Sequence, residues 1–507
     1  MKRRSFGKLL STAGIVVPFS KSFARPLATN QATVALPDVI DNGNSVEICL
    51  NSRYSFHGGY TKNTSNQIIA NILRATAAAP LMATDRIIYA ALPDNLYSYK
   101  YENGMHLVEV HESGDKRTES NTAFEVGVAT NPSDAIEDAG AALHLAQLAS
   151  TAFWSTNNDQ PGCCPKDSAM YDANTQWNPA SNIHLVNCYG QMSSVNGLTD
   201  ERVAVSSDNS LPPPSTDGEM SFEQAVANIE FGTSFDSTDL SKEQISQILW
   251  ASYGCTPHSI MGQAAGITVA SWNYKYYITG KIYVISSTGV DKYQMRNPAS
   301  SANSKEHKLN NITNDDLRST LRSALSSLPS EAPVYFIFCG SKFVREQRLE
   351  AGYCGSSALL QTTSLGLQGH YCAGFSENER TAIQTACSIP SGDIPLLVFS
   401  AGNSKGTGTS RHTFKKAFLN IRVSTSPNPF TRHVTFSMKN SQKPIHITIV
   451  NSRGRTVTQL HAAAVSTGNA TIHWDGTDKT GIRIAPGIYT CLLTSGSTTQ
   501  TFHITRK

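Results

Sequence analysis

Two stretches of the chain combine small side chains with a helical spacing of apolar ones. They are DAIEDAGAALHLAQLASTAF (134–153) and the first part of RLEAGYCGSSALLQTTSLGLQGHYCAGF (348–375). Alanine, glycine and serine allow two helices to approach closely. Upstream of each stretch, at 67–80 and 243–257, apolar residues recur with the period of a helix. The pattern therefore predicts two pairs of helices, repeated about two hundred positions apart.

Strand-like segments repeat between the two members of each helix pair. In both copies an Ile-Tyr strand leads to a turn and a tyrosine, then to a histidine with a leucine close behind, and finally to an acidic residue two positions before an arginine. The matching positions are Ile88, Tyr89, Tyr99, His106, Asp115 and Arg117, and Ile282, Tyr283, Tyr293, His307, Asp316 and Arg318. Five features in the same order indicate a tandem duplication.

The last ninety residues follow a different pattern, in which short strands alternate apolar and polar positions between Asn-Pro, Gly-containing and Pro-Gly turns. This alternation predicts a small β-sandwich over 418–507. Three consecutive prolines within 206–219 indicate an extended, exposed linker between the copies. The predicted organisation is a leader at 1–24, repeat 1 at 45–205, the linker, repeat 2 at 220–403, and the sandwich.

Composition changes this picture little. The chain has 507 residues, of which 39% are hydrophobic and 16% charged, as expected for folded domains with apolar cores. A net charge of +3 without a basic run interleaved with aromatics argues against a nucleic-acid partner. No segment of the mature chain is apolar for the roughly 20 residues that a membrane span needs. The ten cysteines lack the paired spacing of a zinc site, so no metal is expected.

The first 24 residues have the features of an export signal: a basic start, an apolar stretch and a small-residue cleavage site after Ala24. The segment from Arg3 to Lys8, RRSFGK, resembles the twin-arginine signal, which exports folded proteins. A general secretory signal that contains two arginines is the alternative. Either way the sequence predicts an exported protein, in the periplasm, at the outer surface or secreted.

The repeated block resembles the nitroreductase family, and within it the SagB-type dehydrogenases. The resemblance rests on ILWASYG (248–254), the Ile-Tyr strand, the turn at 289–293 and the helix LEAGYCGSSALLQTTSLGL (349–367). It implies an α+β fold with a mixed sheet flanked by helices, and FMN bound at a homodimer interface. Two copies in one chain would then form an intrachain pseudo-dimer, followed by the all-β immunoglobulin-like sandwich.

The resemblance also implies cofactor-binding positions in the first repeat. The family's R-x-S-x-R signature binds the flavin. Arg53, Ser55 and His57 stand at the spacing of this signature, with histidine in place of the second arginine. In the second repeat the matching stretch begins at Glu230, which would repel a phosphate. At most one FMN per chain is therefore expected.

The partner half of the site would come from the second repeat. There Ser271 and Asn273 match the loop that a partner subunit contributes. Gly366 matches the glycine loop that lets backbone pass close to a flavin ring, but it lies in the repeat without the arginine, whereas the family has both motifs on one subunit, which favours loss of the site. The first repeat has no such glycine loop, and its segment 162–182 is expected to be a long loop unlike the family. Because the isoalloxazine carries the hydride chemistry, the sequence assigns no catalytic residue.

The C-terminal sandwich resembles the immunoglobulin-like domain shared by flagellar hook-capping proteins and type IX secretion sorting signals. Asn-Pro-Phe, Asn-x-x-Gly-Arg, Trp-Asp-Gly and Pro-Gly-Ile-Tyr elements stand in order between 428 and 489. The resemblance implies sorting to the outer surface or a spacer role, with the export or sorting machinery as partner.

Two functions follow from these patterns. The first is an exported FMN-dependent oxidoreductase, a dehydrogenase or reductase of a small organic or peptide substrate. The second is a degenerate, cofactor-free scaffold or binding protein displayed at the cell surface.

Overall fold

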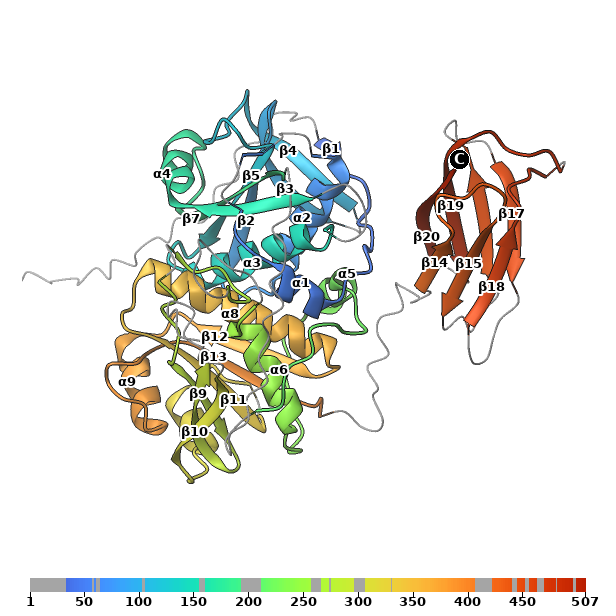
Figure 1. Ribbon diagram of the computed structural model, residues 1–507. Coiled ribbons are helices and arrows are strands. Elements are labelled where there is room, and N and C mark those ends of the chain that lie inside the picture. Colours follow the sequence, from blue (N-terminus) through green and yellow to red (C-terminus); the bar gives the residue numbers. More distant parts are fainter. Residues whose placement is uncertain are drawn as a thin grey trace, which may run out of the picture.

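The chain folds into two α+β units and a separate β-sandwich (Figure 1). The computed structural model describes residues 33–56, 59–60, 64–102, 105–154, 160–192, 211–256, 266–272, 275–295, 306–329, 331–405, 422–439, 445–451, 456–462, 469–479, 481–495 and 498–507. The predicted export signal, His57 and Asn273 lie outside these residues. Within them, no helix is both long enough and apolar enough to cross a membrane.

Unit one forms a seven-stranded sheet in the order β1-β4-β3-β2-β5-β7-β6. Its strands are β1 (Thr33–Ala35), β2 (Asp85–Ala91), β3 (Asn95–Glu102), β4 (Met105–Ser113), β5 (Phe124–Asn131), β6 (Pro161–Lys166) and β7 (Ile183–Gln191). Its helices are α1 (Val46–Ser52), α2 (Asn66–Ala78), α3 (Ile136–Thr151) and α4 (Asp167–Gln176).

Unit two repeats this order, with one additional helix, in a six-stranded sheet β10-β9-β8-β11-β13-β12. Its strands are β8 (Ile282–Ser286), β9 (Gly289–Met295), β10 (His307–Thr313), β11 (Val334–Gly340), β12 (Gln368–Ala373) and β13 (Ile394–Gly402). Its helices are α5 (Phe222–Asn228), α6 (Lys242–Tyr253), α7 (Arg318–Ala324), α8 (Arg345–Ser364) and α9 (Glu377–Ala386), of which α7 is the addition.

Local contacts repeat along with the topology. Tyr99 Oη lies 2.9 Å from His106 Nδ1 in unit one, and Tyr293 Oη lies 2.8 Å from His307 Nδ1 in unit two. The first two helices of each unit begin at a serine whose side chain accepts a bond from a backbone N–H in the first turn, as helix N-caps do. These equivalent contacts explain why the sequence pattern could be read as two copies.

Two predictions about the units are wrong. The predicted mixed sheet is the first, since all neighbouring strands named above are antiparallel. In unit one, β4 ends at the same edge of the sheet at which β5 begins, so β5 runs opposite to its neighbour β2. Segment 162–182 is not a long loop either. It forms most of β6, then α4, whose buried residues Ala169, Met170 and Ala173 lie on one helical face, and it occupies the place that β12 and α9 take in unit two.

The described part of the linker is held against unit two. Leu211 is buried, and its N–H donates to the carbonyl oxygen of His307 at 2.9 Å. Gln247 on α6 both accepts from and donates to the backbone of Ser215. The expected exposure of the linker therefore holds only in part, because an apolar residue beside the prolines reaches the core.

The C-terminal sandwich consists of a three-stranded sheet, β14-β15-β18, and a four-stranded sheet, β17-β16-β19-β20. The strands are β14 (Arg422–Ser426), β15 (Val434–Lys439), β16 (Ile445–Val450), β17 (Thr456–Ala462), β18 (Asn469–Trp474), β19 (Gly487–Ser495) and β20 (Thr498–Arg506). Trp474 and Tyr489 are buried in its own hydrophobic core. Gly476 has φ +77°, which suits a tight turn after Asp475.

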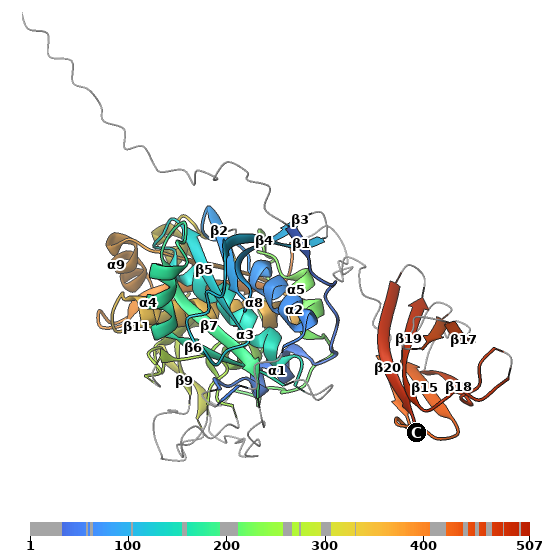
Figure 2. The same cartoon turned by 90° about the horizontal axis from the view of Figure 1, so that it is seen from above.

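The two α+β units are joined by α3 and α8, which lie side by side at the centre of the body in both views (Figures 1 and 2). All of α3 is buried, and one hydrophobic core runs through both units. A Cβ on Gly140 would lie 2.6 Å from the carbonyl oxygen of Leu349, and one on Gly352 would lie 2.2 Å from that of Glu137. The small residues of the two helices therefore permit backbone-to-backbone contact between the units.

Substitution of Gly352 by alanine tests this contact. In an unconstrained helix, alanine would be more stable than glycine by about 0.5–1 kcal/mol. Here the added methyl meets a backbone oxygen that cannot rotate away, so we expect a loss of about 1–3 kcal/mol or more. Calorimetric unfolding of the two-unit body measures it. The control is Gly392→Ala, whose Cβ would meet nothing within 4 Å; equal stability of the two variants would contradict the account.

Candidate functional site between the two units

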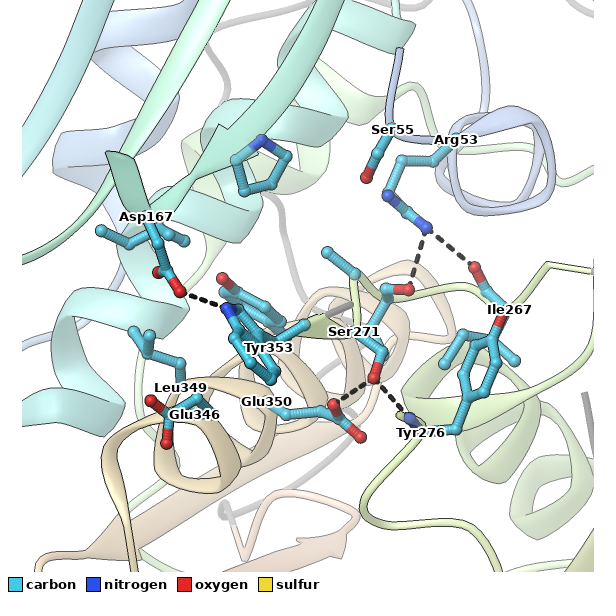
Figure 3. Close-up of a pocket in the computed structure, with 15 residues that line it drawn as sticks. Arg53, Ser55, Asp167, Ile267, Ser271, Tyr276, Glu346, Leu349, Glu350 and Tyr353 are labelled. Atoms are coloured by element: carbon cyan, nitrogen blue, oxygen red, sulfur yellow. Dashed lines mark hydrogen bonds between the residues drawn. The ribbon is translucent and has the colours of Figure 1, made fainter. Parts of the chain in front are cut away.

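A cavity lies between the units, beside the N-terminal half of α8 (Figure 3). Unit one contributes the residues that follow α1, the start of α4 and one position of β7. Unit two contributes the segment 267–272, a tyrosine and one face of α8. The lining residues are Arg53, Ser55, Pro165, Asp167, Leu185, Ile267, Val269, Ala270, Ser271, Trp272, Tyr276, Glu346, Leu349, Glu350 and Tyr353.

Arg53 is a buried cation that ends α1. Its Nε donates to the carbonyl oxygen of Thr268 at 2.9 Å, and its Nη2 donates to those of Ile267 at 3.0 Å and Val269 at 2.9 Å. Among the described residues, no carboxylate pairs with it and no hydrogen bond uses its Nη1. Burial lowers the pKa of Arg53 to about 10, so the guanidinium remains charged at neutral pH. A buried charge without a counter-ion is costly, and an anionic ligand would reduce that cost.

The three acids of the cavity each have their own partners. Arg345 donates from Nη1 to Asp167 Oδ1 at 3.0 Å and from Nη2 to Glu346 Oε1 at 2.9 Å. Glu350 accepts bonds from three neutral donors: Ser271 Oγ at 2.6 Å, Tyr253 Oη at 2.5 Å and the N–H of Ile278 at 3.2 Å. Glu350 also lacks a cationic partner among the described residues, but burial raises its pKa to about 7, so it is only partly charged at neutral pH. Arg53 is therefore the lining residue that keeps a full charge at neutral pH without a described counter-ion.

The sequence-predicted residues are brought together only in part. Arg53 and Ser55 from unit one do line the same cavity as Ser271 from unit two. Ser55 makes no hydrogen bond to the described residues, whereas Ser271 is engaged twice, because it also accepts from the N–H of Tyr276 at 2.7 Å. His57 and Asn273 lie outside the residues that the structure describes.

Gly366 does not line this cavity. It follows the C-terminal end of α8, whereas the cavity contacts residues 346–353 of that helix, about 20 Å away along its axis. A Cβ on Gly366 would meet nothing within 4 Å, but its φ is +71°, so glycine is needed there for the left-handed end of the helix. The cavity between the units therefore does not use Gly366.

The position in unit two that matches Arg53 of unit one has no uncompensated cation. Arg53 ends α1, and Ile229, rather than the expected Glu230, ends α5 at the matching point. Asp138 stands two residues before Gly140, as Glu350 does before Gly352. Asp138 pairs with the buried Arg86, with Nη1 and Oδ2 3.5 Å apart. An internal ion pair and an apolar residue therefore replace the uncompensated cation at the second position.

Sequence reasoning missed the acids that complete the cavity. Glu350, Asp167 and Glu346 carry no motif of their own, and their partners lie tens to hundreds of positions away. The equivalence of Asp138 and Glu350, each two residues before the glycine of a small-residue helix, is the signal that could have indicated a paired role.

FMN fits this site at one end. The uncompensated guanidinium of Arg53 and the hydroxyl of Ser55 suit a phosphate, which accepts charge-assisted hydrogen bonds. The remaining walls are mostly apolar or aromatic, as in other ligand pockets.

Residues 429–499 match the family model of the FlgD Ig-like domain. No curated protein matches the chain. The sandwich is therefore similar to the FlgD Ig-like domain.

Solved structures similar to the chain include a protein of Ralstonia eutropha JMP134 designated a nitroreductase, with 22% identity, a TM-score of 0.33, and coverage of 42% of this chain and 97% of that one. A second, from Anabaena variabilis ATCC 29413 and also designated a nitroreductase, has 13% identity, a TM-score of 0.49, and coverage of 70% and 94%. An FMN-dependent nitroreductase from Clostridium difficile R20291 has 14% identity, a TM-score of 0.25, and coverage of 39% and 98%.

The pH dependence of stability tests the burial of Glu350. Burial raises the pKa of Glu350 to about 7, so folding favours its protonated form. Its contribution to stability is full below the unfolded pKa of about 4.5 and is lost as pH rises through 7. Relative to Glu350→Gln, the native chain should lose on the order of 3 kcal/mol between pH 5 and pH 8. Denaturant unfolding at each pH measures the difference, and parallel curves for the two proteins would show that Glu350 does not titrate in this range.

Proposed function

We propose that the chain is an exported FMN-dependent oxidoreductase of the nitroreductase type, with one FMN in the cavity between its units. The observation that carries this proposal is Arg53, a buried cation that has neither a carboxylate partner nor a hydrogen bond from Nη1 among the described residues. Such a site gains stability from an anion, and the resemblance of the Arg53 and Ser55 frame to the nitroreductase signature favours a flavin phosphate.

The residues of the chain would bind and orient the cofactor. Arg53 and Ser55 would hold the phosphate end, while apolar side chains such as Leu185 and Leu349 would exclude water from the remainder of the cavity. A bound flavin supplies hydride transfer, which needs few catalytic side chains from the protein. A small organic or peptide substrate fits a site with this division of roles.

A second candidate function is a cofactor-free scaffold or binding protein. Three bonds to carbonyl oxygens already engage the Arg53 guanidinium, and Ser271 is engaged as well. The cavity has a volume of about 160 Å³, below the roughly 300–1,000 Å³ of most ligand pockets. These observations favour a site that has lost the flavin and retained the fold.

Replacement of Arg53 by alanine distinguishes the two functions. If Arg53 holds the phosphate, the variant should bind FMN about 10- to 100-fold more weakly, since a hydrogen bond to a charged group contributes about 1.5–3 kcal/mol. Quenching of FMN fluorescence measures the affinity. Arg318→Ala, a half-buried arginine outside the cavity that is paired with Asp316, is the control.

Circular dichroism of the Arg53→Ala protein separates a loss of affinity from a loss of folding. Failure of the native chain to bind added FMN would contradict the oxidoreductase proposal and favour the binding protein. Equal affinities of the native chain and a folded Arg53→Ala variant would contradict the role assigned to Arg53.

We propose further that export uses the twin-arginine route and that the C-terminal sandwich serves sorting or spacing at the outer surface. The support is the RRSFGK segment at 3–8 and the match of 429–499 to the FlgD Ig-like domain. Reduced nicotinamides are scarce outside the cytoplasm, so a dehydrogenase that uses the flavin as oxidant fits this location best.

Substitution of both Arg3 and Arg4 by lysine tests the route. The charge is kept, but the twin-arginine pair is lost, so the full-length precursor should accumulate in the cytoplasm. Fractionation of the native host and N-terminal sequencing measure the outcome, with Lys21→Arg as a charge-preserving control outside the motif. Unchanged export of the double variant would indicate the general secretory route.

A further inference from the structure

One wall of the cavity is a short segment of unit two that is fastened across the interface. We define residues 266–272 as the strap. Five of its seven residues line the cavity, and the side chains that hold it come from both units. Figure 3 shows Ser271 of the strap between Arg53 and Glu350.

Within unit two the backbone of the strap pairs with 254–256, where the N–H of Thr268 donates to the carbonyl oxygen of Gly254 at 2.9 Å. Three side chains hold it at further points. Arg53 of unit one binds the carbonyl oxygens of three consecutive strap residues, 267–269. Glu350 of α8 accepts from the hydroxyl of Ser271 at 2.6 Å. Trp272, which is 43% exposed, donates its indole N–H to the carboxylate of Asp167 at the start of α4. Two of these three fastenings, those of Arg53 and Asp167, join the strap of unit two to unit one.

The fastening to Arg53 conflicts with ligand binding at the same group. Two guanidinium nitrogens, Nε and Nη2, are occupied by strap carbonyls, and only Nη1 remains for an anion. A phosphate carries more charge than a carbonyl dipole and binds arginine best through two nitrogens. A phosphate that takes two nitrogens of Arg53 must therefore displace at least one strap carbonyl.

We propose that the strap is a ligand-controlled gate, in which an anionic ligand competes with the strap for Arg53 and the contact between Trp272 and Asp167 keeps the strap closed in its absence. This inference rests on the proposed function for the identity of the ligand, FMN. It makes Arg53, Asp167 and Trp272 the residues that control entry and selects ligands with a phosphate over those without one.

Hydrogen–deuterium exchange of the strap in the full chain tests the fastening without any ligand. Asp167→Asn weakens the acceptor and Trp272→Phe removes the donor while keeping an aromatic ring, so both should raise exchange of the strap amides severalfold. Asp316→Asn, a surface acid paired with Arg318 in unit two, is the control and should match the native chain. Unchanged exchange in both Asp167→Asn and Trp272→Phe would overturn the proposal, whether or not FMN binds.

The rate of FMN association, followed by stopped-flow quenching of flavin fluorescence, tests the gate itself. Both strap variants should bind FMN faster than the native chain and Asp316→Asn, by roughly the factor of their exchange increase. FMN should raise exchange of the strap in the native chain, whereas riboflavin, which lacks the phosphate, should not. Equal association rates, or equal effects of FMN and riboflavin, would overturn the gate. If neither the native chain nor the variants bind FMN, but the strap amides of the variants still exchange faster, the proposed function is contradicted. The role of Asp167 and Trp272 in holding the strap is then still supported.

Discussion

The close crossing of α3 and α8 is the contact on which the arrangement of both units depends. At Gly140 and Gly352 the two backbones meet so closely that a single methyl group would overlap a carbonyl oxygen. Next to this crossing, Arg348 of unit two donates from Nε to Glu137 Oε1 at 2.6 Å and from Nη2 to Glu137 Oε2 at 2.8 Å. A buried bidentate pair of this kind is costly to break, since the remaining charge would be left unpaired. Packing and charge together define one relative position for the two units.

The cavity is a consequence of that position. The crossing places one face of α8 opposite the end of α1 and the start of α4, so that each unit supplies part of the lining. The two halves of the pseudo-dimer then differ in charge. One has an uncompensated arginine, Arg53. At the matching point the other has Ile229, with the acid Asp138 neutralised by Arg86. The two units therefore share the order of their sheets, while the charges at the matching positions differ.

The sequence predicted the order of elements well because that order depends on local signals. The Ile-Tyr strands, the Tyr–His pairs and the small-residue helices recur in register, and the structure contains them as equivalent elements. The resemblance to the R-x-S-x-R signature also predicted that Arg53 and Ser55 would lie at the same site as Ser271. Glu350 and Asp167 could not be predicted, because their roles depend on contacts with loops of other segments. Gly366, which matched a glycine loop of the family, lies outside this cavity, and its positive φ is a second reason for glycine at that position.

Titration of the flavin-free native chain with FMN to saturation, with the number of sites read from the end point, tests the central claim most directly. The account predicts one FMN per chain, since only one of the two pseudo-symmetric positions combines a buried, uncompensated arginine with a hydroxyl. Two FMN per chain would contradict the asymmetry between the halves. No binding at all would contradict the assignment of the cavity to a flavin.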